Sequence, residues 1–439
     1  MRKTPIDYQI VSESIKELNI PNLNCATIRE IVKIVNSIEN RTNDKFIRME
    51  MGIPGLAPPE IGTKAEIEAL KNGVASSYPM LGGITPLKEE TSKFVKNFMD
   101  IDITTECCIP SVGSMQGGFA TFLLASNLDT QKDTALFIDP GFSVQKLQFK
   151  VMGHKYTNFD VYNYRGKKLR GKLEEFLSKG NINSIIYSNP NNPTWICFTE
   201  EELQIIGELA TKYDVIIIED LAYFAMDFRV DMAQPGVAPF QPTVARYTSN
   251  YILLISSSKA FSYAGQRLGM ICVSDALFCR EYDNLKKRFG ASSFGYTLIQ
   301  RILYSLSSGT SHSAQYALAA MFKAANKGEF NFINEVKYYG ERAAIMKKIF
   351  TNNGFNIVYD KDIDKELADG FYFTISYPGM DSGQLLEHLL YYGISAITLN
   401  TCGSERTEGL RACVSQVKPE QFEVLENRVK QFNSDFSTN

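Results

Sequence analysis

The sequence predicts an α/β fold, in which a large domain with a mostly parallel central sheet precedes a smaller α+β domain. The chain has 439 residues, enough for two domains. In its middle, short aliphatic runs alternate with helical periodicity, as in parallel βαβ units. After about residue 310 a long helical stretch leads into mixed strand and helix patterns. We therefore expect an N-terminal segment (1–50) that packs on the small domain, a large domain (51–310), and a small domain (311–439) entered through a long helix.

Composition and charge exclude several protein classes. Hydrophobic residues make up 44% and charged residues 22%, which excludes disorder and coiled coil as the main architecture. The net charge of −3 gives no bulk attraction to nucleic acid or to an anionic membrane. The apolar runs are far shorter than the roughly 20 residues of a membrane span, and the N-terminus lacks the apolar stretch of a signal peptide. We expect a cytoplasmic protein with small-molecule partners, no nucleic acid and no membrane.

Cysteine and histidine usage argues against a metal site. The eight cysteines form no CxxC pair, and the three histidines, His154, His312 and His388, are isolated from one another. Zinc sites need such residues at short spacing, and histidine-based catalysis needs a histidine near a nucleophile. We therefore expect reduced cysteines and no bound metal.

Strands of the large domain are indicated by aliphatic runs that are too short for helices. Thr199 to Glu202 has the pattern of a capping box, and helical periodicity follows it. Because ligands lie beyond the carboxyl ends of strands in open α/β sheets, the residues that follow these runs are candidates for chemistry. They include aromatic, amide, carboxylate and amine groups. The predicted strands are Ala135–Ile138, Ile185–Tyr187, Val215–Ile218 and Tyr251–Ile255.

The elements of the N-terminal segment and the small domain follow from the same reasoning. An amphipathic helix is expected at Ile28–Ile38. A helical stretch from Ala314 to Phe350 is interrupted near Lys327 and Gly328. The remaining expected elements are the strands Phe371–Ile375 and Gly409–Val414 and the helices Gly383–Tyr392 and Pro419–Phe432.

The groups after the strands match what one cofactor, pyridoxal 5'-phosphate, needs from a protein. Its aldehyde needs a lysine amine, and its ring nitrogen needs a carboxylate. Its phosphate needs backbone N–H groups at a helix start and a guanidinium. Its phenolate oxygen needs hydrogen-bond donors, and its ring needs a flat partner. The sequence offers Lys259 for the aldehyde, Asp220 for the ring nitrogen, Asn192 and Tyr223 for the phenolate oxygen, Phe142 for stacking, and Ser114, Met115 and Arg267 for the phosphate.

These segments resemble the motifs of one enzyme family, in the same order along most of the chain. The family is the class I/II aminotransferases, similar to aspartate aminotransferase and of fold type I among pyridoxal phosphate enzymes. The segments that carry the resemblance are SSYPMLGGITPLKEE around Tyr78, SNPNNPTW around Asn192, IIIEDLAY around Asp220, SSSKAFSYAGQRLG around Lys259 and GLRACVS around Arg411.

The resemblance implies a role for each matching residue in catalysis. Lys259 holds the cofactor as an aldimine and then moves the proton between the substrate Cα and the cofactor. Asp220 keeps the ring nitrogen protonated, and Tyr223 acts through the phenolate oxygen. The resemblance implies a ping-pong aminotransferase that moves the amino group of an L-amino acid to a 2-oxo acid.

Further binding roles are also implied by the resemblance. Ser256 joins the phosphate-binding group, and Tyr78 reaches the phosphate of a neighbouring subunit, which implies a homodimer. Arg411 binds the substrate α-carboxylate with two hydrogen bonds, a geometry that lysine cannot reproduce. Asn192 and Gly52, the latter in a Gly-x-Pro loop, complete the substrate side.

Several of these residues also fit a purely structural role. Arg411 is compatible with a paired arginine in a core strand, with Arg406 as its rival for the carboxylate. Ser114 is compatible with a helix N-cap, Phe142 with a core aromatic residue and Tyr78 with a plain turn. For the function, the main alternative is a pyridoxal phosphate lyase or decarboxylase on the same scaffold. A non-catalytic regulator is disfavoured because no basic helix-turn-helix precedes the core.

Two departures from the family pattern bear on the substrate. Trp195 stands where the family turn usually has glycine, so the backbone after Thr194 is expected to differ and Trp195 to border the substrate entrance. In Lys286–Gly290 no second arginine for a substrate side-chain carboxylate can be placed. The sequence therefore leaves the preferred amino acid open.

Overall fold

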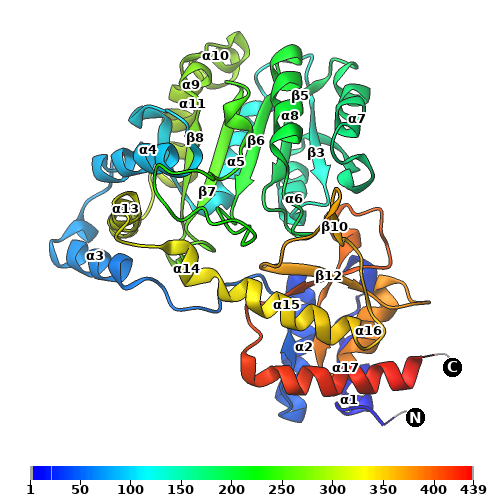
Figure 1. Cartoon of the computed structure of the whole chain (residues 1–439). Coiled ribbons are helices and arrows are strands. Elements are labelled where there is room, and N and C mark those ends of the chain that lie inside the picture. The colour runs from blue at the N-terminus through cyan, green and yellow to red at the C-terminus, as the bar shows by residue number, and fades with distance from the viewer. Residues whose placement is uncertain (1–2, 21, 438–439) are drawn as a thin grey trace. The chain divides into compact units, whose positions relative to one another are not determined.

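Residues 3–20 and 22–437 are described by a computed structural model, and they divide into two units (Figure 1). The terminal unit contains Met1–Gly55, Asn192–Ile196 and Lys337–Asn439. The central unit contains Leu56–Asn191 and Cys197–Val336. Among the described residues, no helix is long and apolar enough to cross a membrane.

The central unit is built on a mixed, mostly parallel sheet. The strands from β7 to β4 are parallel, whereas β8 runs antiparallel to both of its neighbours. The predicted α/β fold with its mostly parallel sheet is confirmed, and the four predicted strands are neighbours. Within the described residues the sheet order is β2 (Cys108–Val112), β8 (Leu268–Val273), β7 (Tyr251–Ser256), β6 (Ile216–Leu221), β5 (Ile182–Ser188), β3 (Thr134–Asp139) and β4 (Lys155–Asp160).

Helices cover both faces of this sheet. The crossovers β3–α6–β4 and β5–α8–β6 run in opposite directions across the sheet, so right-handed connections put α6 (Ser143–Met152) and α8 (Glu200–Tyr213) on opposite faces. Helix α5 (Gly113–Ala125) packs with α6, and α7 (Lys168–Leu177) packs with α8. Helix α8 begins at the predicted capping box, in which the Glu202 N–H donates to Thr199 Oγ1 at 3.3 Å.

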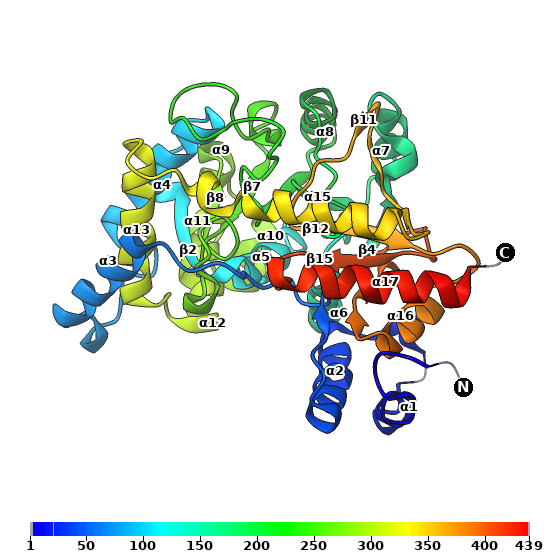
Figure 2. The same ribbon diagram turned by 60° about the horizontal axis from the view of Figure 1, so that its bottom comes forward.

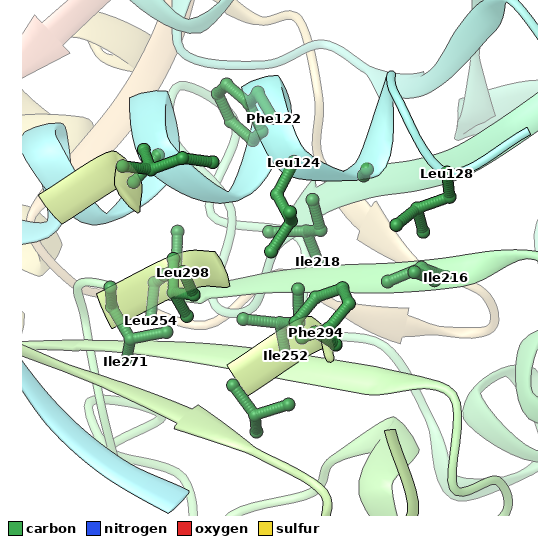
Figure 3. Close-up of a cluster of buried hydrophobic side chains, with 14 of the residues drawn as sticks. Phe122, Leu124, Leu128, Ile216, Ile218, Ile252, Leu254, Ile271, Phe294 and Leu298 are labelled. Atoms are coloured by element: carbon green, nitrogen blue, oxygen red, sulfur yellow. The ribbon is translucent and has the colours of Figure 1, made fainter. Parts of the chain in front are cut away.

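The main core of the central unit lies between α5 and the sheet (Figure 3). Side chains alternate along β6, so Ile216 and Ile218 face α5. Asp220 is next in this alternation and therefore faces the same side, at the carboxyl end of the strand. The buried residues that surround these two isoleucines include Phe122, Leu124, Leu128, Ile252, Leu254, Ile271, Phe294 and Leu298.

Another group of helices in the central unit packs together. Helix α13 (His312–Asn326) packs against α3 (Glu60–Lys71) and α4 (Thr85–Met99). For this reason α13 belongs to the central unit, which extends to Val336. The domain limits 1–50, 51–310 and 311–439 remain a prediction. Shorter helices are α9 (Asp275–Cys279), α10 (Asp283–Phe289), α11 (Phe294–Thr297), α12 (Tyr304–Ser307) and α14 (Phe332–Val336), and the π-helical stretch Leu298–Leu303 joins α11 to α12.

The terminal unit joins the two ends of the chain around an antiparallel sheet. Its order is β14 (Ile397–Thr398), β15 (Leu410–Cys413), β12 (Tyr372–Ser376) and β9 (Asn356–Ile357). A second pair, β1 (Ile47–Arg48) with β13 (Ile394–Ser395), is parallel, and β10 (Lys361–Asp362) pairs with β11 (Lys365–Glu366). Helices α15 and α17 lie side by side (Figure 2). The helices are α1 (Tyr8–Glu17), α2 (Ile28–Thr42), α15 (Tyr338–Thr351), α16 (Ser382–Tyr391) and α17 (Phe422–Phe436).

Candidate active site

A buried carboxylate, that of Asp220, ends strand β6 of the central unit. Its Oδ2 accepts a hydrogen bond from Gln145 Nε2 at 2.8 Å, and its Oδ1 accepts one from the Ala222 N–H at 3.1 Å. Only 7% of the Asp220 surface is exposed. Gln145 was not predicted from the sequence, because a single glutamine in a helical stretch carries no distinguishing signal.

The environment of Asp220 favours a cation beside it. Burial raises the pKa of Asp220 to about 6. The Ala222 N–H, the positive charge of Lys259 and the Gln145 amide act in the opposite direction. Asp220 and Lys259 are therefore close enough to interact electrostatically, which is what a shared site requires.

Lys259 lies in a tight loop that follows strand β7. The loop closes where the Tyr263 N–H donates to Ser257 O at 3.0 Å. At its start, Ser257 Oγ donates to Leu268 O at 2.6 Å and the Ser258 N–H donates to Ser256 Oγ at 3.1 Å. These bonds fix the backbone on both sides of the half-buried Lys259.

The start of helix α5 forms an anion-binding arrangement. Gly113 is the first helical residue, and a Cβ there would lie 2.6 Å from Arg267 Nη2, so the guanidinium lies directly over the helix start. A Cβ on Gly269, which pairs with Ser256 across the sheet, would lie 2.9 Å from Ser114 N. Free N–H groups at a helix start and a guanidinium together favour a phosphate.

Ser114 does not cap this helix. The N-cap residue is Val112, and the Gln116 side chain accepts from the Val112 N–H at 2.8 Å. Ser114 is the second helical residue, with Met115 after it, so their N–H groups belong to the first turn. The interpretation of Ser114 as an N-cap is therefore wrong.

Helix α6 is fixed at two strand ends by its first turn. Gln145 binds Asp220 at the end of β6, and Lys146 Nζ lies 2.5 Å from Asp139 Oδ2 at the end of β3. Burial raises the pKa of Asp139 to about 7, and Lys146 opposes that rise. Phe142, the N-cap residue of α6, is half-buried and is held by the same anchors.

Tyr223 follows Asp220 by three residues and lies in the turn that ends strand β6. It is 4% exposed. The turn is closed by the Phe224 N–H donating to Leu221 O at 3.2 Å and the Met226 N–H donating to Tyr223 O at 3.1 Å. The backbone therefore fixes Tyr223 close in the chain to the buried carboxylate.

The terminal unit brings together Arg411 and Asn192. Arg411 lies in β15, paired with Thr374, and is 2% exposed. Its Nη1 donates to Asn192 Oδ1 at 3.4 Å and its Nη2 donates to Glu50 O at 2.6 Å. The guanidinium lies 4.7 Å from the centroid of the Tyr372 ring. The Tyr372 ring and the Glu50 carbonyl thus hold the Arg411 guanidinium in one orientation.

Gly52 belongs to the same surroundings. A Cβ at Gly52 would lie 2.0 Å from the Tyr372 hydroxyl oxygen, so only glycine allows the loop to pass there. Tyr372 was not predicted as a site residue, since it is one aromatic residue among several in its strand. Arg406, the sequence rival of Arg411, instead lies over the Tyr359 ring, 5.5 Å from its centroid.

The prediction that Trp195 borders a substrate entrance is wrong. Its side chain is fully buried, at 0% exposure. It packs edge-on against Tyr372 with ring centroids 6.2 Å apart, and a Cβ on Gly370 would lie 1.9 Å from the indole. Its φ of 68° is the left-handed conformation that glycine adopts most easily. The turn therefore keeps a glycine-like backbone, and the packed indole offsets the strain of about 1–2 kcal/mol.

Tyr78 is almost fully exposed, at 89%. Its turn is anchored by His312, whose Nδ1 lies 3.2 Å from Val74 O and 3.1 Å from Ser77 O. A role toward a neighbouring subunit remains a prediction. Lys286, Lys287 and Arg288 are exposed in the last turn of α10, so this stretch shows no buried arginine for a substrate side chain.

Comparison with known proteins shows the family. The family model described as aminotransferase class I and II matches residues 44–429, so the chain belongs to this family. A probable aspartate aminotransferase of Methanocaldococcus jannaschii is 25% identical over 316 residues, covering 72% of this chain and 75% of that protein. An aspartate aminotransferase of Pyrococcus horikoshii is 28% identical over 245 residues, covering 56% of this chain and 58% of that protein.

Solved structures show the same fold. An alanine aminotransferase from Pyrococcus furiosus has a TM-score of 0.75 at 18% identity, covering 93% of this chain and 97% of that chain. An aspartate aminotransferase from Thermotoga maritima has a TM-score of 0.74 at 18% identity, covering 96% and 99%. The chain is therefore an aminotransferase, an enzyme that transfers an amino group from an amino acid to an oxo acid. None of these findings favours a lyase or a decarboxylase.

Proposed function

We propose that this aminotransferase works with pyridoxal 5'-phosphate, by a ping-pong cycle between an L-amino acid and a 2-oxo acid. The observation that carries the proposal is the electrostatic coupling of Asp220 and Lys259 in the central unit. A buried carboxylate whose pKa is raised by desolvation gains stability from a cation, and the protonated ring nitrogen of the cofactor is such a cation. Asp220 and Lys259 therefore fit pyridoxal 5'-phosphate.

The residues of the central unit would divide the binding work among them. Asp220 would hold the ring nitrogen, and Lys259 would hold the cofactor covalently through its amine. The first turn of α5, with Ser114 and Met115, would bind the phosphate together with Ser256 and Arg267. Phe142 would lie against the ring. Tyr223, and Asn192 of the terminal unit, are the proposed donors to the phenolate oxygen.

The bound cofactor supplies an electron-withdrawing ring that makes the Cα proton of the substrate acidic. The Lys259 amine would act as the general base that takes this proton and would return it as the general acid. Asp220, whose two donors oppose the effect of burial on its pKa, would hold the ring nitrogen in its protonated form.

In the terminal unit, Arg411 would bind the α-carboxylate of the substrate. Its side chain is buried and oriented by Glu50 O and by the Tyr372 ring, so little freedom is lost on binding. Two parallel hydrogen bonds from a guanidinium match a carboxylate. Gly52 leaves room beside Tyr372 for this arrangement.

The assembly and the location stay proposals. A homodimer in which Tyr78 contacts the phosphate in the neighbouring subunit accounts for an aromatic side chain with 89% of its surface exposed. The cytoplasmic location rests on the sequence expectation alone. Analytical ultracentrifugation of the purified protein tests the dimer.

Amino acids and oxo acids supplied in sequence test the reaction. The enzyme is loaded with cofactor, mixed with a panel of amino acids, separated from the free ligands and then given 2-oxoglutarate or pyruvate. We expect the new amino acid to form only in the second step, in an amount equal to the enzyme. Release of ammonia or CO2 in the first step, with no need for an oxo acid, would contradict the proposal.

A further inference from the structure

One buried carboxylate outside the proposed active site is bonded to the loop that carries Lys259. Glu66, on helix α3, is 7% exposed. Its Oε2 accepts a hydrogen bond from the Tyr263 hydroxyl at 2.5 Å, and its Oε1 accepts one from Ser313 Oγ at 3.0 Å. Two hydroxyl donors therefore occupy the two oxygens of one carboxylate, in a place that the proposed chemistry does not use.

Tyr263 is the closing residue of the lysine loop. Its N–H donates to Ser257 O at 3.0 Å, and Ser257 Oγ in turn binds Leu268 O at 2.6 Å. The ring is 5% exposed, and burial, followed by the Glu66 carboxylate, raises the pKa of its hydroxyl. The hydroxyl therefore stays protonated and donates to Glu66. Through this bond the end of the loop is fixed to α3.

The other donor to Glu66 comes from the start of helix α13. Ser313 is adjacent to His312, whose Nδ1 contacts Val74 O and Ser77 O. Because both partners are carbonyl oxygens, Nδ1 carries the hydrogen. The residues of the Tyr78 turn and of the Lys259 loop are therefore linked through two adjacent residues of α13 and one carboxylate of α3.

We propose that Glu66 is a positioning residue for Lys259. It fixes the closed form of the lysine loop through Tyr263 and joins that loop, through Ser313 and His312, to the turn that carries Tyr78. This inference rests on the proposed role of Lys259 as the residue that holds the cofactor. Nothing in the sequence indicates the link, because Glu66 and Tyr263 are about 200 positions apart and Tyr263 and Ser313 are about 50 positions apart.

The test compares Tyr263→Phe with a matched control in the terminal unit. Tyr392→Phe also removes a buried tyrosine hydroxyl that donates to a carboxylate, Asp435 Oδ2, at 2.6 Å. For each variant we would measure the dissociation constant of pyridoxal phosphate, the pH midpoint of the cofactor absorbance band, and the melting temperature of the cofactor-free protein.

We expect Tyr263→Phe to raise the dissociation constant about tenfold and to displace the pH midpoint, since a hydrogen bond to a charged group is lost from the lysine loop. Tyr392→Phe should lower the melting temperature and leave both cofactor readings unchanged. Glu66→Gln keeps an oxygen acceptor for Tyr263 and should therefore keep most of the affinity for pyridoxal phosphate. Ser313→Ala should lose less of that affinity than Tyr263→Phe.

If both variants melt at the same temperature and both give wild-type cofactor readings, the positioning role is overturned. If Tyr263→Phe fails to fold, Ser313→Ala with unchanged cofactor readings would overturn the link. Failure of the proposed function would look different, because the unaltered protein would then bind no cofactor at Lys259.

Discussion

Gln145 donates a hydrogen bond of 2.8 Å to the carboxylate of Asp220, and both side chains are 7% exposed. The two residues are 75 positions apart, and the first turn of α6 brings the amide to the end of β6. An amide cannot titrate, so this donor remains in place at every pH. The bond orients the carboxylate and opposes the effect of burial on its pKa.

Removing this donor should weaken cofactor binding. Gln145→Leu keeps the volume but leaves Asp220 with one donor fewer in a buried place, which costs about 1.5–3 kcal/mol. We expect the dissociation constant of pyridoxal phosphate to rise by about 10- to 100-fold. Gln204→Leu, which removes an exposed bond to Glu208 on α8, is the control and should bind normally. Normal binding by Gln145→Leu, measured by absorbance titration, would refute the role.

The raised pKa of Asp220 predicts that the cofactor-free protein is stabilised by losing this charge. Because the folded pKa of about 6 lies above the ordinary aspartate value, the folded state binds the proton more tightly than the unfolded chain. Stability therefore falls as pH rises from about 4 to 6. At pH 8 the free energy of unfolding of cofactor-free Asp220→Asn should exceed that of the wild type by on the order of 2–3 kcal/mol. Near pH 4 the two free energies should be equal. Urea unfolding at both pH values measures this, and a variant less stable at pH 8 would contradict the assignment.

Arg411 and Arg406 can be told apart by conservative substitution. Arg411→Lys keeps the charge but loses the paired hydrogen bonds, so KM for amino acids should rise about 10- to 100-fold. Arg406→Lys should leave KM unchanged, because Arg406 lies over the Tyr359 ring. Steady-state kinetics with one amino acid decides between them. The reverse result would show that Arg406, and not Arg411, binds the α-carboxylate of the substrate.

Gly52→Ala should disturb the substrate side through one defined collision. The new Cβ would lie 2.0 Å from the Tyr372 hydroxyl, so the tyrosine that packs on Arg411 must move and KM should rise. Tyr372→Phe in the same chain removes that oxygen and should recover part of the loss. Gly171→Ala in α7 meets nothing within 4 Å and should stabilise the protein by about 0.5–1 kcal/mol. Unchanged kinetics in Gly52→Ala would show that this loop does not position the substrate.

The sequence predicted the sheet and the residues at its carboxyl ends because both follow from local patterns. Lys259, Asp220 and Asn192 each stand within five residues of the end of an aliphatic run. Partners from distant segments could not be predicted in this way: Gln145 and Glu66 carry no local signal. Trp195 was misplaced because its position in a turn suggested exposure, whereas its indole packs against Gly370 and Tyr372.

Borohydride reduction of the cofactor-loaded enzyme, followed by peptide mass spectrometry, tests the central claim most directly. Lys146, a buried lysine paired with Asp139 and one residue from Gln145, provides an internal comparison. We expect a single pyridoxyl group on Lys259, and none in Lys259→Ala. A pyridoxyl group on Lys146 or on any other lysine, with Lys259 unmodified, would contradict the pairing of Lys259 with Asp220.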